Sequence, residues 1–219
     1  DLSAAQGLGL ILVLGAVLSH ECVATTAAAR RSSGLKETLR AEMGGSVRQA
    51  TAGRYHLTAG PASAIDQERV TRLVGALAVF EDAYRTMWRG HPALRESATT
   101  VELFLLVESG HLRRIIKDAE IAQPLFDTGG LYLKESATLI IENASLLERS
   151  ILASLVHETT HFLNHEILQG DAFPPWLNEG LAQYCEFSRY AGPGADRGFH
   201  LGVIDPGAEL RVPHGDEEM

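Results

Sequence analysis

Residues 145–168 read SLLERSILASLVHETTHFLNHEIL, and this stretch decides how the rest of the chain must be arranged. Ser145 and Glu148 form a capping-box pattern before a sustained helical run, which predicts a helix over residues 145–168. His157 and His161 lie four residues apart, so both imidazoles project from one face of that helix. The stretch therefore predicts a helix that presents two histidines to a single metal ion.

A second helix is expected after a short loop. Gly170 and two prolines interrupt the helical pattern, and Pro175 suits the first turn of a helix over residues 176–188. A catalytic zinc ion takes three protein ligands and leaves one position open for water. Glu179 is the best candidate for the third ligand, because the loop allows the second helix to lie opposite the histidines.

The motifs of both helices resemble those of a known family. Residues 175–184, PWLNEGLAQY, resemble the third-ligand helix of the gluzincins, the metallopeptidases that combine HExxH with a downstream glutamate. The closest resemblance is to bacterial peptidase-MA-like domains formerly labelled as a domain of unknown function. It covers the order of elements over residues 54–187, and its specific motifs lie within residues 157–186.

This resemblance implies a chemistry. The zinc ligands of the family correspond to His157, His161 and Glu179, and its general base corresponds to Glu158. Zinc lowers the pKa of its bound water towards about 7, and Glu158 would accept the proton of that water. We therefore expect a metallopeptidase with one Zn²⁺ ion and a peptide or protein substrate. Two alternatives are a catalytically idle metal-binding domain that recognises a peptide or envelope partner, and a zinc hydrolase of a non-peptide amide.

Other polar residues near the motifs allow more than one interpretation. A ligand role for His165 would follow the metzincin pattern, which requires glycine at position 164 and histidine at position 167, where this chain has Asn164 and Ile167. His165 is therefore expected to support a ligand, to face the substrate or to lie on the surface. Asn178 is expected to orient a ligand or to cap its helix, and Trp176 to anchor packing.

An oxyanion-stabilising donor is harder to assign. Related peptidases place a tyrosine or histidine downstream of the third ligand for this purpose. The nearby donors of the right type are Tyr184, Tyr190 and His200, and the sequence leaves open which of them, or none, has this role.

The remaining patterns predict an α+β fold. Residues 66–88 carry one wide apolar stripe of helical spacing, which predicts a long helix. Short apolar or alternating runs predict strands over residues 54–58, 101–107, 129–132 and 138–142. We expect a small mixed sheet packed on the long helix, followed by the two metal-bearing helices. The family resemblance implies that an edge strand, residues 131–134 or 139–142, lies above the zinc and binds an extended peptide by strand addition.

Composition and charge limit the class of protein. The chain has 219 residues, 45% of them hydrophobic, and a formal net charge of −9, which fits one globular domain and argues against a nucleic-acid partner. Of the two cysteines, Cys185 sits in an apolar helical pattern and is expected to be a buried thiol.

The ends of the chain are expected to lie outside the catalytic domain. Residues 1–29 contain a short apolar run and small residues that suit a signal peptide, or else an N-terminal apolar segment. A signal peptide implies an extracytoplasmic protein, secreted or periplasmic, with no stable membrane span after its removal. Residues 30–53 are expected to be a polar linker, residues 54–190 the zincin-like domain, and residues 191–219 a Gly/Pro-rich and acidic tail or a truncation.

Overall fold

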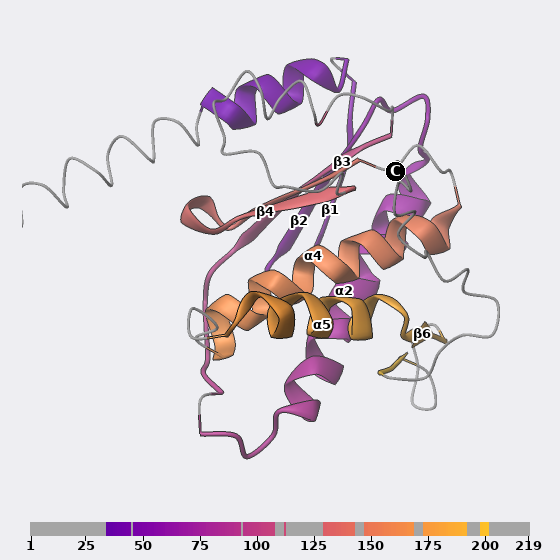
Figure 1. Cartoon of the computed structure of the whole chain (residues 1–219). Helices are drawn as coiled ribbons and strands as arrows, with labels where there is room; N and C mark the ends of the chain where they lie inside the picture. Colours follow the sequence, from indigo (N-terminus) through magenta and orange to yellow (C-terminus); the bar gives the residue numbers. More distant parts are fainter. Residues whose placement is uncertain are drawn as a thin grey trace, which may run out of the picture.

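The computed structural model describes residues 34–44, 46–92, 94–107, 112, 129–142, 147–168, 173–191 and 198–201. Within these residues a five-stranded sheet lies between one short helical segment, residues 34–42, and a layer of longer helices (Figure 1). In chain order the elements are β1 (Arg48–Ala52), β2 (Tyr55–Gly60), α2 (Gln67–Met87), β3 (Val101–Leu106), β4 (Gly130–Leu133), the 3-10 turn η1 (Lys134–Ser136), β5 (Thr138–Glu142), α4 (Glu148–Leu168), α5 (Pro175–Glu186), β6 (Arg189–Tyr190) and β7 (Phe199–His200).

The sheet is mixed, with the strand order β1-β2-β3-β5-β4. The three central strands β2, β3 and β5 are parallel, and the two outer strands are each antiparallel to their neighbour. A tight hairpin through η1 joins β4 to β5, with Ala137 in the left-handed conformation at φ 45°. β4 therefore forms one edge of the sheet, beside α4 (Figure 1).

The two faces of the sheet bury different partners. Leu103 and Leu139 pack with α2 and α4 in the main core, whereas Phe104 and Ile140 face a smaller cluster that includes Leu39. This division follows from strand geometry, because successive side chains of a strand point to opposite faces. The central strands are buried on both sides, which explains their continuous apolar sequences.

The long helix α2 begins at a well-formed cap. The side chain of Asp66 accepts a hydrogen bond from the backbone N–H of Arg69, and this satisfies a donor that the first turn leaves free. Further along α2, the buried Glu81 accepts hydrogen bonds from Tyr55 of β2, at 2.7 Å, and from Arg54 and Arg85. This cluster ties α2 to the sheet.

The predicted α+β class is confirmed, and the three long helices lie within a few residues of their expected ranges. The expectation of a polar linker over residues 30–53 does not hold for the described part of that range. Residues 34–42 are helical and bury Leu35 and Leu39 against the sheet, and β1 pairs with β2. Four charged side chains in the helical segment concealed its narrow apolar stripe.

Three further expectations concern the edge strand and the ends of the chain. Residues 139–142 are not an edge, since β5 lies between β3 and β4, so the alternative of residues 131–134 is the one that matches the structure. Residues 198–201 of the expected tail include β7, which pairs with β6. The expected signal segment, residues 1–29, lies outside the described residues. Among the helices described, none combines the length and apolar character needed to cross a membrane.

Candidate metal centre

Helices α4 and α5 bring the three predicted ligands together. The Nε2 atom of His157 lies 3.6 Å from Oε2 of Glu179, and Nε2 of His161 lies 3.5 Å from Oε1 of the same carboxylate. One ligand atom from each residue can be chosen so that all three lie within 4.8 Å of one another. The histidines lie one turn apart on α4, and Glu179 faces them from the first half of α5.

The spacing of these atoms fits a zinc ion. Ligand atoms at about 2.0–2.1 Å from a tetrahedral zinc ion are about 3.3 Å apart, close to the two histidine–glutamate separations. Two imidazole nitrogens and one carboxylate oxygen are also a donor set of catalytic zinc sites, which leave the fourth position open. The three side chains therefore suit the metal that the sequence predicts.

Glu186 supports the first histidine and was missed by the sequence analysis. Its Oε2 atom lies 2.9 Å from Nδ1 of His157, on the side of the ring opposite the Nε2 atom that faces Glu179. A carboxylate in this position fixes the orientation of a ligand histidine and makes it a better donor. Helical spacing could have revealed it, because a residue seven positions after Glu179 lies on the same face of α5.

Glu158 is buried beside the ligands. Only 6% of its surface is exposed. Burial and the nearby carboxylates Glu179 and Glu186 raise the pKa of Glu158 to about 7, although His157 acts in the opposite direction. The side chain also lies directly under the edge strand β4, because a Cβ atom added to Gly130 would be 2.5 Å from Oε1 of Glu158.

The charges around the histidines favour a cation. Burial opposes protonation of His157, but the carboxylates of Glu179 and Glu186 outweigh it and raise the pKa of His157 to about 10. Burial and the charge of His157 lower the pKa of His161, against the effects of Glu179 and Asn178. The neighbouring imidazole of His157 lowers the pKa of Glu179. Three carboxylates around two imidazoles thus concentrate negative charge where a metal ion would bind.

The positions of Asn178 and Trp176 exclude one expected role of each residue. Pro174 is the N-cap residue of α5, so Asn178 does not cap the helix, and its side chain accepts a hydrogen bond of 2.7 Å from Asn164. Trp176 is 74% exposed and is therefore not the packing anchor that we expected. Its place in the first turn of α5 turns it away from the core. Cys185 is buried and unpaired, as expected.

His165 contacts the edge strand rather than the predicted ligands. Its Nδ1 atom lies 3.1 Å from the hydroxyl of Tyr132 in β4 and 3.3 Å from Oε1 of Glu166. Helical spacing places His165 one turn beyond His161, on the same side of α4. The structure therefore puts this histidine beside the site without making it a fourth ligand in the described arrangement.

The three candidate oxyanion donors do not meet the ligands. Tyr184 lies five positions after Glu179, about 140° away around α5, and is 45% exposed. Tyr190 stacks on Phe199 at 4.9 Å, and His200 is an exposed residue of β7. Among the described contacts, none joins these three side chains to the predicted ligands.

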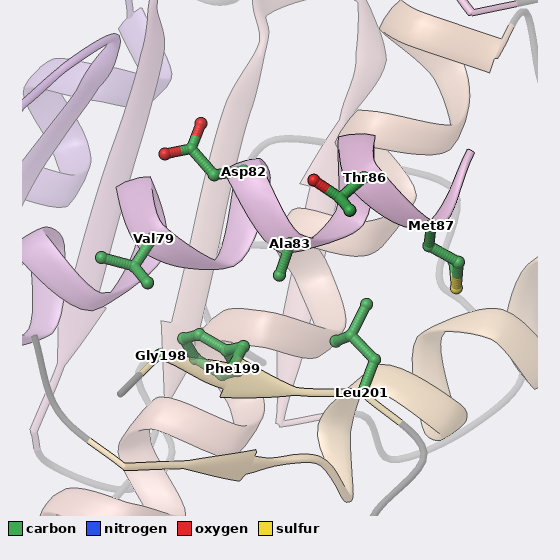
Figure 2. A pocket seen from close by; sticks show the side chains of 8 residues that line it. All are labelled: Val79, Asp82, Ala83, Thr86, Met87, Gly198, Phe199 and Leu201. Carbon is green, nitrogen blue, oxygen red and sulfur yellow. The ribbon is translucent and has the colours of Figure 1, made fainter. Parts of the chain in front are cut away.

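A separate groove lies away from the metal centre. It has a volume of about 470 Å³ and opens between α2 and the segment around β7 (Figure 2). Val79, Ala83 and Met87 of α2 form one wall, and Phe199 and Leu201 form the other. None of the predicted ligands lines it.

Comparison with protein families and with curated proteins does not indicate a function for this chain. No model of a protein family matches the chain, and no curated protein is significantly similar to it. The function is therefore inferred from the residues of α4, α5 and β4.

Proposed function

We propose that this protein is a zinc-dependent metallopeptidase in which His157, His161 and Glu179 hold the metal ion. The observation that carries the proposal is the arrangement of these three side chains at zinc-ligand spacing, with Glu158 buried next to them. A chance HExxH sequence on a helix would not bring a third ligand from a different helix to the same point. It would also not place a carboxylate behind His157.

Each residue of the site has a role that its position supports. A zinc ion held here would lower the pKa of a bound water and polarise a substrate carbonyl group. Glu158 is placed to accept a proton from water and to pass it to the leaving amine. Glu186 keeps His157 in the orientation that directs Nε2 towards Glu179.

The edge strand β4 supports a peptide as the substrate. It is the outermost strand of the described sheet and lies directly over Glu158. Extended peptides bind other proteins by adding a strand to such a position. Gly130 lets the backbone of β4 approach Glu158 more closely than any other residue would allow. A peptide bound along β4 would therefore pass over the catalytic carboxylate.

Metal analysis and turnover together test the proposal. We expect one equivalent of zinc in the purified full chain, loss of zinc in Glu179→Ala, and retained zinc but abolished peptide cleavage in Glu158→Gln. Glu166→Gln is a matched control on α4, because Glu166 binds Ser97 and Thr99 instead of the metal ligands. A parent protein that takes up no zinc would refute the metal centre.

A second candidate function is a metal-binding domain that recognises peptides without cleaving them. It is favoured by the positions of Tyr184, Tyr190 and His200, which do not reach the ligands. The same experiment separates the two functions. A parent protein that holds zinc but cleaves no member of a broad peptide library, and that still binds extended peptides, would support the second.

A further inference from the structure

A line of polar side chains, two of them fully buried, connects the three long helices. The hydroxyl of Tyr84 in α2 donates to Oδ1 of Asn164 in α4, and Nδ2 of Asn164 donates to Oδ1 of Asn178 in α5 at 2.7 Å. Tyr84 and Asn164 are 0% and 1% exposed. Buried polar groups of this kind cost free energy unless they are paired, so each member depends on the next.

This line ends at two of the predicted metal ligands. Asn178 immediately precedes Glu179 in α5, and Asn164 lies three residues after His161 on α4. The buried Nδ1 atom of His161 has no hydrogen-bond partner among the described side chains. The line of hydrogen bonds therefore runs from α4, one turn after His161, to the residue that precedes Glu179 on α5.

Among the residues that the structure describes, few others anchor the first half of α5. Its fully buried residues are Ala182 and Cys185, which lie after Glu179, and its N-cap residue makes no side-chain capping bond. Glu179 itself has a side chain that is 57% exposed. Glu186 ties the last turn of α5 to His157, whereas the bond from Asn164 to Asn178 ties its first half to α4.

We propose that Tyr84 and Asn164 are positioning residues that set metal affinity by fixing Asn178 and Glu179 relative to His161. The inference rests on the metal centre proposed above and extends it to α2, which supplies none of the predicted ligands. Tyr84 orients the Asn164 amide, the amide fixes Asn178, and Asn178 fixes the first half of α5. Loss of the Tyr84–Asn164 bond or of the Asn164–Asn178 bond leaves Glu179 less well aligned with the two histidines.

Two variants and one control test this role in the full-length chain. Tyr84→Phe removes one hydroxyl, and Asn164→Leu removes both bonds of the amide at similar volume. Tyr55→Phe is the matched control, because Tyr55 is equally buried and its hydroxyl donates to Glu81 instead of the line to α5. Zinc affinity is measured by competition with a chromophoric chelator, and ligand geometry by the visible absorption of the Co²⁺-substituted protein.

We expect the zinc dissociation constant to rise about 2- to 30-fold in Tyr84→Phe, which is the range for residues that act on a site from a distance. The rise should be larger in Asn164→Leu, which loses both hydrogen bonds. Both variants should also shift the Co²⁺ absorption bands. Tyr55→Phe should lower the melting temperature of the metal-free protein and leave affinity and bands at the parent values.

The outcomes separate this inference from the proposed function. If the parent binds zinc and Tyr84→Phe lowers only the melting temperature, with parental affinity and Co²⁺ bands, the positioning role is refuted and the metal centre stands. If the parent binds neither metal, the metal centre and the positioning role are both refuted. Should Asn164→Leu fail to fold, Tyr84→Phe alone still decides between these results.

Discussion

At the scale of single residues, the candidate metal centre includes residues that contact or adjoin the predicted ligands. His157 is backed by Glu186, and Glu179 lies next to Asn178, which is bonded to Asn164. In the proposed metal centre such contacts would orient the ligand side chains for a metal ion. The ligand motif is thus part of a larger hydrogen-bonded arrangement, and its outer members should matter for affinity.

Replacement of Glu186 tests the outer contact of His157. We expect Glu186→Ala to weaken zinc binding about 10- to 100-fold, because the imidazole loses the carboxylate that orients it. Glu186→Gln should lie between this variant and the parent, since an amide oxygen can still accept the Nδ1–H bond. Chelator competition measures the affinities. Equal affinity in all three proteins would show that Glu186 has no part in metal binding.

Gly130 tests the close approach of β4 to Glu158. In Gly130→Ala the new methyl group would lie 2.5 Å from a carboxylate oxygen, so Glu158 or the strand must move. We expect peptide cleavage to be lost and stability to fall by about 1–3 kcal/mol in urea unfolding. Gly129→Ala is the control, because its Cβ would meet only a backbone oxygen at 3.5 Å. Similar behaviour of the two variants would contradict the proposed contact.

At the scale of elements, helices and strands are joined by polar clusters as well as by the core. Glu81 connects α2 to Arg54 and Tyr55 at the start of β2, and Arg54 also lies over the ring of Phe162 in α4 at 5.5 Å. The sheet and the two helices therefore meet at one buried carboxylate. Its ionisation contributes to how firmly these elements are held together.

Because Glu81 is ionised in the folded state, we expect the free energy of unfolding to fall in acid. Burial would raise the pKa of Glu81, but hydrogen bonds from Tyr55, Arg85 and Arg54 outweigh it and hold the pKa below its usual value. A carboxyl group with a lowered pKa in the folded state stabilises at neutral pH, and this stability is lost as pH falls through the folded-state pKa.

We therefore expect Glu81→Gln to lose about 3 kcal/mol at pH 7, and less as the pH approaches the folded-state pKa, in urea unfolding at a series of pH values. Glu68→Gln removes an exposed partner of Arg72 and should change stability by less than about 0.5 kcal/mol. A constant difference between Glu81→Gln and the parent across the acid range would contradict the assigned ionisation.

The helical segment 34–42 can be tested as a structural cover for the far face of the sheet. Leu39 is fully buried against Phe104 and Ile140. We expect Leu39→Ala to reduce the free energy of unfolding by about 2–5 kcal/mol while zinc affinity stays at the parent value. Glu37→Ala, at an exposed position of the same segment, should leave both unchanged. Unchanged unfolding of Leu39→Ala would show that the segment does not contribute to the fold.

At the scale of the whole molecule, the sheet separates a structural side from the side that carries the site. The segment 34–42 covers one face, and α2, α4 and α5 lie on the other, with β4 at the edge nearest Glu158 (Figure 1). A metal ion held by both α4 and α5 would join two elements that are otherwise linked by a short loop and a shared interface. Metal binding should therefore affect the stability of the whole fold.

Zinc removal tests this coupling. A ligand that binds only the folded state stabilises it by an amount that grows with its free concentration, about 2.7 kcal/mol at one hundred times the dissociation constant. We expect the melting temperature of the parent to fall on chelation and to recover with added zinc. Glu179→Ala should show neither change. A parent melting temperature that is independent of zinc would argue that the ion does not bridge the two helices.

The sequence by itself determined the three long helices and four of the strands and predicted the candidate ligands, because these depend on local spacing. Apolar periodicity predicted α2, the four-residue step aligned His157 with His161, and the proline-bounded motif predicted a helix around Glu179. The helical segment 34–42 was missed because its apolar stripe is narrow among charged residues. Its burial depends on a sheet face that is assembled from distant strands.

Only the tertiary structure decided which residues meet across those elements. Strand order made β4 the edge and β5 an interior strand, although both sequences suited either place. The contacts of Gly130 with Glu158 and of Tyr84 with Asn164 join segments that no local pattern relates. The physical reason is that hydrogen bonding and close packing act between surfaces, and folding alone sets which surfaces face each other.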